Sequence, residues 1–266
     1  MGDMKLSRKK VVLRCDDFGS AEGANEAILE LAQSGMAKNI SILVCGAFAQ
    51  SGASRLSSLP KEVNLGIHLA INSEWDIVKW GPVAESSKQS VLVDSKGYFL
   101  SSSNDLSKKE GLSTELIIDE ARAQILKALS WNLLFSYIDE HMVFGFMLTN
   151  YTPRVFPDLA SRLALLAKEF GLIYLPDLVL LPESPDLPME PLARWSAQIR
   201  AAGPGPTLMP VHPAKSDVIM LQMGDSSTPL GKVAADRDSE YKILKSEAFH
   251  QLLREERVEL VGYKQL

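Results

Sequence analysis

The chain alternates short apolar runs, which are typical of buried strands, with segments whose apolar residues recur at helical spacing. The run Val11-Val12-Leu13 opens this pattern, and the next segment carries apolar residues at positions i, i+3, i+4 and i+7: Ala24, Ala27, Ile28 and Leu31. Strands that alternate with helices predict a parallel α/β fold. Because we count about seven strand candidates, we expect a single distorted (β/α) TIM-like barrel with about seven parallel strands, and an open sheet fits less well.

The length and composition suit one such domain. The chain has 266 residues, which fits a single α/β barrel over residues 1–266. Hydrophobic residues make up 46% of the chain, enough for a sizeable core, and charged residues make up 23%. Both periodic patterns are lost around residues 72–113, where the sequence becomes polar. A loop insertion of this length is typical of lids and binding loops.

Charge and hydropathy exclude several classes of partner. The net charge is −5 and no dense Lys/Arg patch is present, so we expect no nucleic-acid partner. No run approaches the ~18 to 20 apolar residues of a membrane span, and the first apolar run ends at Arg14, too early for a signal peptide. Cys15 and Cys45 are interpreted as small core residues. These features predict a cytoplasmic protein without a membrane partner, and they leave a homodimer open.

Two adjacent carboxylates, Asp16 and Asp17, lie between the end of the first predicted strand and the start of the first predicted helix. Adjacent carboxylates repel each other, so a folded protein needs a reason to keep both charged. A metal ion supplies one reason, with one carboxylate as a ligand and the other free to act as a base. The competing interpretation is a helix N-cap, which explains one Asp better than two.

Three of the four histidines, His68, His141 and His212, stand at or just after the carboxyl ends of predicted strands, and His250 falls within the last helix. In a parallel barrel those strand ends converge on one mouth. One Asp and two His could hold Zn²⁺ or another divalent ion, a second Asp could act as a base, and another His could protonate a leaving amine. This set suits the hydrolysis of an amide or ester. A packing role remains the simpler interpretation of any one histidine taken alone.

Two tryptophans, Trp75 and Trp80, lie in the long polar segment. Their flat faces could contact a sugar or another ligand, so both are candidate substrate-binding residues. The alternative is that they pack the loop onto the body of the protein.

Several motifs, in order along nearly the whole chain, resemble those of the YdjC-like carbohydrate deacetylases, the family that includes chitooligosaccharide deacetylase. The matching stretches are Asp16-Asp17-Phe18-Gly19, Asn25-Glu26-Ala27-Ile28, Leu65-Gly66-Ile67-His68-Leu69, Glu120 with Gln124, Asp139-Glu140-His141, His212-Pro213, and the tail from Arg237 through Glu240 to Leu244. The resemblance implies a distorted (β/α) barrel that uses one divalent metal ion, Mg²⁺ or Zn²⁺, to remove acetyl groups from N-acetylated sugars.

The same resemblance implies roles for individual residues. Asp17, His68 and His141 would be the metal ligands. Asp16 would be the general base, and His212 the general acid or a stabiliser of the transition state. The substrate would be a chitooligosaccharide or a related carbohydrate.

The chain departs from the family pattern at two places. Glu140 replaces a serine before His141, and Met142 and Val143 replace further histidine after it. Ala214 replaces the glycine of a His-Pro-Gly motif. The first change bears on the substrate side of the site, and the second on the position of His212.

Two other functions remain open from the sequence. The same ligands would serve another metal-dependent barrel reaction, such as sugar isomerisation or hydrolysis of a different amide. The altered residues around His141 would also suit a sugar-binding protein without turnover.

Overall fold

The computed structural model describes residues 8–266, so residues 1–7 of the predicted domain lie outside the description. The strands are β1 (Lys9–Phe18), β2 (Asn39–Ile42), β3 (Asn64–Leu69), β4 (Phe135–Glu140), β5 (Thr207–Val211) and β6 (Val258–Leu260). The α-helices are α1 (Glu22–Gln33), α2 (Ala49–Leu56), α3 (Ser103–Ser107), α4 (Thr114–Leu129), α5 (Phe144–Asn150), α6 (Leu159–Glu169), α7 (Pro191–Ala201), α8 (Lys232–Lys245) and α9 (Glu247–Glu255). Three short 3₁₀ helices complete the set: η1 (His141–Val143), η2 (Met220–Gln222) and η3 (Tyr263–Gln265).

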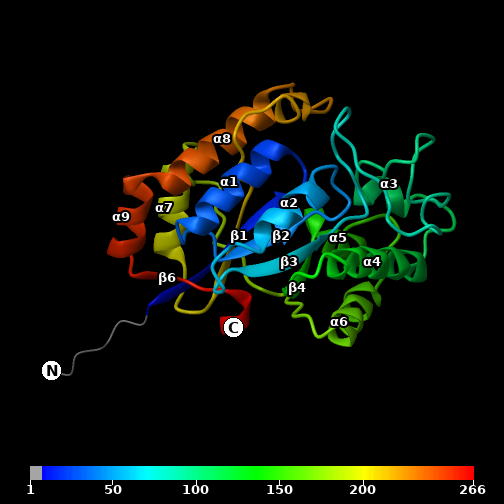
Figure 1. Ribbon diagram of the computed structural model, residues 1–266, viewed down its shortest axis with the longest axis horizontal. Coiled ribbons are helices and arrows are strands. Elements are labelled where there is room, and N and C mark those ends of the chain that lie inside the picture. The colour runs from blue at the N-terminus through cyan, green and yellow to red at the C-terminus, as the bar shows by residue number, and fades with distance from the viewer. Residues whose placement is uncertain (1–7) are drawn as a thin grey trace.

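All strand pairs are parallel, as predicted, and the sheet order is β4-β3-β2-β1-β5. The short strand β6 pairs with the beginning of β1. It lies on the same side of β1 as β2, which pairs with the later part of that strand. Figure 1 shows the strands in the middle of the molecule, with α1 and α2 in front and α4, α5 and α6 to the right. Because parallel strands run the same way, their carboxyl ends gather at one edge of the sheet.

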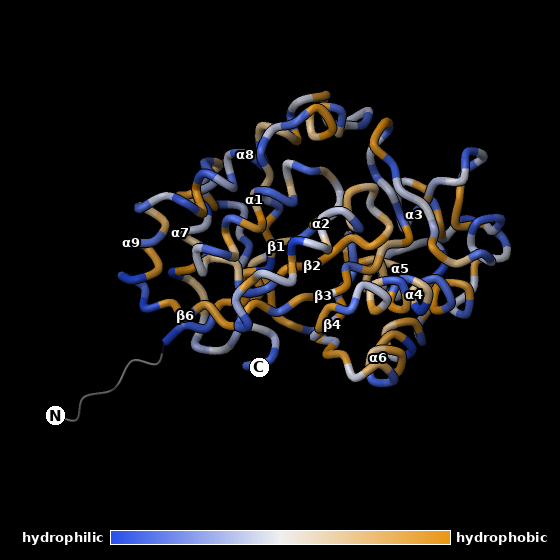
Figure 2. Tube along the Cα trace, in the orientation of Figure 1, coloured by the Kyte–Doolittle hydropathy of each residue, from blue (hydrophilic) through white to orange (hydrophobic). Residues whose placement is uncertain are grey.

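The central strands are buried on both faces. Every residue of β2 and β3 is buried, as are the last eight of β1. Figure 2 shows these strands as mainly hydrophobic segments enclosed by helices of mixed character. One cluster of buried hydrophobic residues extends in sequence from Val11 to Leu253, so the two ends of the described chain share a core.

The predicted closed barrel of about seven strands is not confirmed. Six strands form among residues 8–266, and their ladders do not connect β4 to β5. The predicted strand at residues 172–175 contributes only a single bridge, Ile173 beside Tyr137, and Leu180 makes another beside β5. Pro176 follows shortly after the first of these contacts, and proline is disfavoured inside a strand. Irregular chain therefore occupies the place where further strands would close the sheet.

The long segment at residues 72–113 is largely irregular, but it is anchored to the core. It contains the short helix α3 and an isolated antiparallel bridge between Val93 and Phe99. The side chains of Leu92, Phe99 and Leu106 are fully buried. These apolar anchors give the polar segment a defined position beside the carboxyl edge of the sheet.

A glycine in β3 makes room for a buried tyrosine. A Cβ atom on Gly66 would lie 2.1 Å from the Tyr137 ring, which is fully buried and stacks on Tyr263 with ring centroids 3.9 Å apart. Alanine would ordinarily suit a strand interior better than glycine. Here the close approach of the ring reverses that preference.

We therefore expect Gly66→Ala to lower the free energy of unfolding by about 1 to 3 kcal/mol or more, because the stacked ring has no space to retreat. Gly203→Ala is the matched control, since a Cβ atom there meets nothing within 4 Å. Urea unfolding of both variants checks the expectation. Equal midpoints for Gly66→Ala and the wild type would show that Tyr137 can move.

Candidate active site

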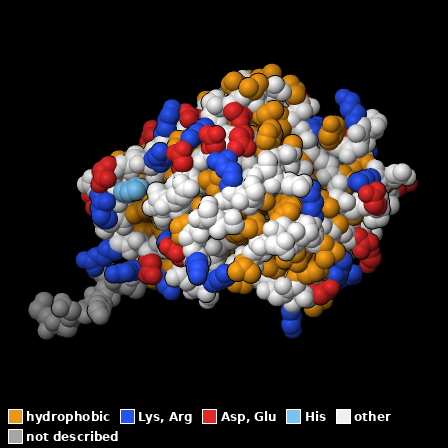
Figure 3. Space-filling model, viewed as in Figure 1, with side chains coloured by type: hydrophobic (Ala, Val, Ile, Leu, Met, Phe, Trp, Pro, Cys, Tyr) orange, Lys and Arg blue, Asp and Glu red, His pale blue; other side chains and the backbone are white. Residues whose placement is uncertain are grey.

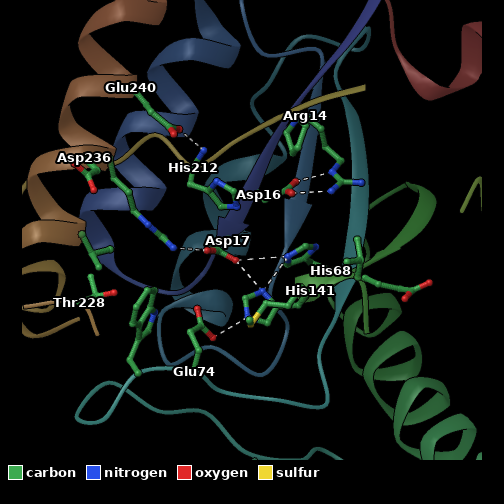
Figure 4. Close-up of a pocket in the computed structure, with 17 residues that line it drawn as sticks. Arg14, Asp16, Asp17, His68, Glu74, His141, His212, Thr228, Asp236 and Glu240 are labelled. Atoms are coloured by element: carbon green, nitrogen blue, oxygen red, sulfur yellow. Dashed lines mark hydrogen bonds and ion pairs between the residues drawn. The ribbon is translucent and has the colours of Figure 1, made fainter. Parts of the chain in front are cut away.

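The predicted site residues converge on one pocket of about 520 Å³ at the carboxyl edge of the sheet. The ends of β1, β3 and β5, the turn after β4, the long insertion and helix α8 supply its polar lining (Figure 4). The lining includes all five predicted metal-binding and catalytic residues: Asp16, Asp17, His68, His141 and His212. The parallel topology accounts for this convergence, because it brings all of these strand ends to the same edge.

The two adjacent carboxylates point to different partners because the backbone turns between them. Asp17 adopts a left-handed conformation with φ of 63°, which Asp tolerates better than most residues. The pairing of β1 with β2 shifts register between Cys15 and Phe18, which is the same place. In Figure 4 the Asp16 carboxylate points towards Arg14, and that of Asp17 points towards the two histidines.

A buried amide holds the turn that follows the Asp pair. Asn25, fully buried on α1, accepts a hydrogen bond from the Gly19 N–H at 2.7 Å and donates one to the Phe48 carbonyl at 3.0 Å. Gly19 has φ of 101°, and a Cβ atom there would lie 2.8 Å from Ala49. The turn therefore requires glycine at this position, and it fixes where β1 delivers its carboxylates.

Three side-chain atoms face one another in the pocket. Asp17 Oδ1 lies 3.5 Å from His68 Nε2 and 3.3 Å from His141 Nδ1, and the two nitrogens are 3.2 Å apart. Ligands at about 2.0 to 2.2 Å from one tetrahedral Zn²⁺ lie about 3.3 to 3.6 Å from each other. Asp17 Oδ1 is buried and accepts no hydrogen bond from the described residues. The three residues could therefore hold a metal ion.

Each histidine has a carboxylate behind it that selects its tautomer. His68 Nδ1 lies 3.1 Å from Asp139 Oδ2, and His141 Nε2 lies 2.9 Å from Glu74 Oε2. A carboxylate accepts the N–H, so the other ring nitrogen can present its lone pair to an ion at the centre of the trio. Hydrogen bonds of this kind orient metal-binding histidines and raise their basicity.

The charges around the trio favour an ionised Asp17. Burial opposes ionisation, but Arg237, at 2.7 Å from Asp17 Oδ2, and His141 hold the pKa of Asp17 well below its usual range. Burial also lowers the pKa of His141, yet Glu74 and Asp17 outweigh it and raise that pKa to about 10. His141 therefore carries a second ring proton at neutral pH. A cation that binds here displaces that proton, so higher pH favours its binding.

Arg14 links the two halves of the site. Its guanidinium donates to both oxygens of Asp16, at 2.6 and 2.7 Å, and lies 2.8 Å from Asp139 Oδ2. Asp16, His68 and Asp139 form a second cluster with the spacing of metal ligands. The guanidinium already supplies a positive charge to that cluster, so we assign no metal to it.

His212 enters the pocket from the end of β5. Its backbone N–H donates to Glu240 Oε2 at 2.6 Å, which fixes the start of the loop after the strand. Within residues 8–266 its imidazole ring makes no hydrogen bond with the protein. The ring is therefore available to a molecule in the pocket.

The altered residues around His141 shape the lip of the pocket. Glu140 accepts hydrogen bonds from the Gly145 N–H and the Tyr174 hydroxyl. Met142 and Val143 both have positive φ, of 51° and 45°, and both line the pocket. A β-branched residue is strained in that conformation, so the Glu140 contacts hold a turn that the local sequence does not favour.

The two tryptophans of the insertion have different positions. Trp75 lines the pocket, where a ligand could contact it. Trp80 is only 3% exposed and donates its indole N–H to the Asn72 carbonyl. Its ring packs edge-on against His141, with the ring centroids 5.3 Å apart. Its ring therefore has no open face for a sugar, and we assign it to the support of His141.

Some of the residues that support the site could have been predicted from sequence spacing, and others could not. Arg14 stands two residues before Asp16, which places both side chains on one face of β1, and Arg237 and Glu240 share one face of α8. The first spacing could have predicted the contact of Arg14 with Asp16, but the second does not show that Arg237 meets Asp17 or that Glu240 meets the backbone of His212. No local pattern marks Glu74, which reaches His141 only through the path of the insertion.

The fold and the pocket together define a parallel α/β protein with a candidate metal site at the carboxyl edge of its sheet. A family model described as YdjC-like protein matches residues 10–255, so the chain belongs to the YdjC-like family. The resemblance drawn from the motifs is thereby confirmed.

Curated relatives carry the name carbohydrate deacetylase. The chain is 30% identical over 132 residues to one from Vibrio parahaemolyticus and 26% identical over 140 residues to one from Thermoanaerobacter pseudethanolicus. It spans about half the length of these relatives, 48% and 50% respectively, and each alignment covers 50% of this chain. A relative from Danio rerio is 28% identical over 172 residues, which is 64% of this chain and 50% of the relative.

A solved structure shares the fold. The crystal structure of a "putative cellobiose-phosphate cleavage protein" from Enterococcus faecalis V583 superposes with a TM-score of 0.75 at 19% sequence identity. The match covers 97% of this chain and 99% of that one. Separately, no helix among residues 8–266 combines the length and apolar character needed to cross a membrane.

Glu74 gives a specific expectation for metal binding. We expect Glu74→Gln to weaken Zn²⁺ binding about 10- to 100-fold, because the amide no longer fixes the His141 tautomer as firmly. Glu85→Gln, in the same insertion but with its side chain 87% exposed, is the matched control. Calorimetric titration of both variants with Zn²⁺ checks this. Equal affinities for the two variants would mean that Glu74 does not act on the site.

Proposed function

We propose that this chain is a metal-dependent hydrolase that removes the acetyl group from an N-acetylated carbohydrate. The observation that carries the proposal is the trio of facing ligand atoms, with Asp17 Oδ1 buried and without a hydrogen-bond partner among residues 8–266. Asp16 and His212 line the same pocket. Membership of the YdjC-like family and the deacetylase names of the relatives support the same reaction.

Asp17, His68 and His141 would hold one divalent ion. When bound, the ion would polarise the acetyl carbonyl and lower the pKa of a water molecule. Two imidazoles and one carboxylate favour Zn²⁺ or a similar transition metal over Mg²⁺, which prefers oxygen ligands. Arg237 keeps the second oxygen of Asp17 occupied, so Oδ1 is the oxygen directed at the ion.

Asp16 would take a proton from the attacking water. Arg14 holds its carboxylate by both oxygens, and each oxygen keeps a lone pair for a further contact. The fixed orientation matters because a general base must lie within hydrogen-bond reach of the proton that it removes. In this arrangement Arg14 is a positioning residue.

His212 would protonate the amine that leaves. Hydrolysis adds a hydroxyl group to the acetyl carbon, breaks the C–N bond, and needs one proton on the departing nitrogen. The ring of His212 has no hydrogen-bond partner in the described part of the chain, and its backbone is anchored by Glu240. It can therefore meet that nitrogen from the β5 side of the pocket.

The two other candidate functions have less support. A sugar isomerase or a different amide hydrolase could use the same ligands, but the names of the relatives point to deacetylation. A sugar-binding protein without turnover would not need to retain base, acid and ligands together. Here all five lie in one pocket despite the changes around His141.

The metal ligands can be tested apart from activity. We expect the wild type to bind one Zn²⁺ per chain in calorimetric titration, and Asp17→Asn and His68→Ala to lose most of that affinity, because each removes a ligand atom. Circular dichroism confirms that the variants are folded. Unchanged affinity in both folded variants would place the ion elsewhere.

The base assignment predicts a different result for the neighbouring carboxylate. Asp16→Asn should keep Zn²⁺ binding and lower the rate of acetate release by about 10²- to 10⁴-fold, because the amide cannot accept the proton. The assay uses N-acetylated mono- and oligosaccharides, with added metal and with chelator. Normal turnover by Asp16→Asn would show that Asp16 is not the general base. If metal-loaded wild type released no acetate from any sugar, the deacetylase proposal would fail.

A further inference from the structure

Alternate residues of the central strands form layers beneath the pocket. Side chains two positions apart in a strand point to the same face of the sheet, so Val12 and Arg14 form one column on β1. Tyr137 and Asp139 form a second column on β4. Val12 and Tyr137 belong to a small buried cluster, whose other members are Leu208, Val261 and Tyr263. The polar residues of the site therefore rest on an apolar layer.

Two stacked tyrosine rings in that layer direct their hydroxyl groups at polar residues of the site. The rings of Tyr137 and Tyr263 are nearly parallel, with an interplanar angle of 7°. The Tyr263 hydroxyl accepts a hydrogen bond from Arg14 Nη1 at 3.2 Å, and the Tyr137 hydroxyl lies 2.9 Å from Ser41 Oγ. All four side chains are buried. The stack therefore supplies one hydroxyl to each of two polar networks.

The first network leads from Tyr263 to the proposed base. Arg14 Nη1 donates to the Tyr263 hydroxyl and lies 2.8 Å from Asp139 Oδ2. The Nε and Nη2 atoms of Arg14 form the fork that holds Asp16. A buried N–H without a partner is costly, so the hydroxyl stabilises the plane in which the fork faces Asp16. The backbone N–H of Tyr263 donates to Asn39 Oδ1 at 3.0 Å, which holds the tyrosine in place.

The second network leads from Tyr137 to a candidate metal ligand. Ser41 has one hydroxyl proton, which it donates to Asp139 Oδ2 at 3.1 Å, so Tyr137 donates its own proton to Ser41. The same Asp139 oxygen lies 3.1 Å from His68 Nδ1. Burial raises the pKa of Tyr137 well above its usual range and that of Tyr263 to about 12, so both hydroxyls keep their protons at neutral pH. The Tyr137 hydroxyl can therefore serve as the donor that this chain of hydrogen bonds requires.

We infer that Tyr263 and Tyr137 are positioning residues for the two halves of the site. Tyr263 acts through Arg14 on the proposed base, and Tyr137 acts through two intervening side chains on the candidate ligand His68. Neither tyrosine lines the pocket, so each acts from beneath it. The consequences for turnover and metal binding rest on the proposed function, but the two hydrogen-bond networks can be tested without it.

Nuclear magnetic resonance of the metal-free protein tests both networks directly. We expect Tyr263→Phe to speed the exchange of the Arg14 Nε–H proton with solvent at least about fivefold, because the fork to Asp16 opens more often. Tyr137→Phe should have the same effect on the His68 Nδ1–H proton, and each variant should affect its own network more than the other. An unchanged exchange rate in a folded variant would overturn the role of the tyrosine that it lacks.

The two variants should also differ in function. We expect Tyr263→Phe to lower kcat for acetate release about 3- to 30-fold and to leave KM and Zn²⁺ affinity within about twofold, because the ligands and the pocket walls are intact. Tyr137→Phe should weaken Zn²⁺ binding about 3- to 30-fold in calorimetric titration. Phenylalanine keeps the stacked ring, so a tyrosine that only filled the core would show no such split. Equal losses of kcat and Zn²⁺ affinity in both variants would overturn the assignment of separate roles.

The intervening serine provides a double-mutant cycle. Ser41→Ala should reproduce the loss of Zn²⁺ affinity in Tyr137→Phe, because both substitutions interrupt one chain of hydrogen bonds. The double variant should then bind Zn²⁺ no more weakly than either single variant. Additive losses would show that Tyr137 does not act through Ser41 and would overturn this part of the inference.

The matched control lies on the outer surface between α1 and α8, where acidic and basic side chains mix (Figure 3). There the Tyr241 hydroxyl donates to Glu30, which also forms ion pairs with Lys215 and Lys245. Tyr241→Phe removes a hydrogen-bonded hydroxyl outside both networks, so it should leave proton exchange, kcat and Zn²⁺ affinity unchanged. An equal effect in this control would overturn the assignment. If the wild type releases no acetate, the proposed function fails and the exchange rates still decide the inference.

Discussion

The structure depends on the burial of three carboxylates, Asp16, Asp17 and Asp139, at the carboxyl edge of a parallel sheet. Buried charges of one sign are tolerated only when positive groups compensate them. Arg14 contacts both Asp16 and Asp139, and Arg237 binds one oxygen of Asp17. The remaining oxygen of Asp17 faces two histidines and has no other partner in the described part of the chain, so a cation would complete the balance of charge.

This electrostatic balance explains why the site draws on such distant parts of the chain. The carboxylates come from β1 and β4, and the compensating groups come from β1 and α8. Glu74, from the long insertion, orients His141 through a hydrogen bond at the Nε2 atom of that ring. The insertion is thus part of the architecture of the site, and the buried Trp80 holds it against the same histidine. Changes in the insertion would therefore reach the metal ligands as well as the sugar-facing wall.

The departures from the family motif have a structural explanation. Glu140 cannot be exchanged freely, because its carboxylate holds the strained turn through Gly145 and Tyr174. A Cβ atom on Gly145 would lie 2.6 Å from that carboxylate, so the two positions are coupled. Met142 and Val143 give the lip an apolar surface where further histidines would have made it polar. The changes alter the entrance to the pocket, and the candidate ligands keep their facing arrangement.

The sequence by itself determined the parallel α/β class and the convergence of Asp16, Asp17, His68, His141 and His212, because the positions and ends of strands along the chain follow from local apolar patterns. Only the tertiary structure decided how the sheet ends. The proline-interrupted chain after Ile173 pairs too briefly to close it, and pairing between distant segments leaves no local signal. Tertiary structure also decided which groups form ion pairs or hydrogen bonds with each buried charge. Arg237 and Glu74 reach their partners through the folding of the whole chain, which local periodicity does not encode.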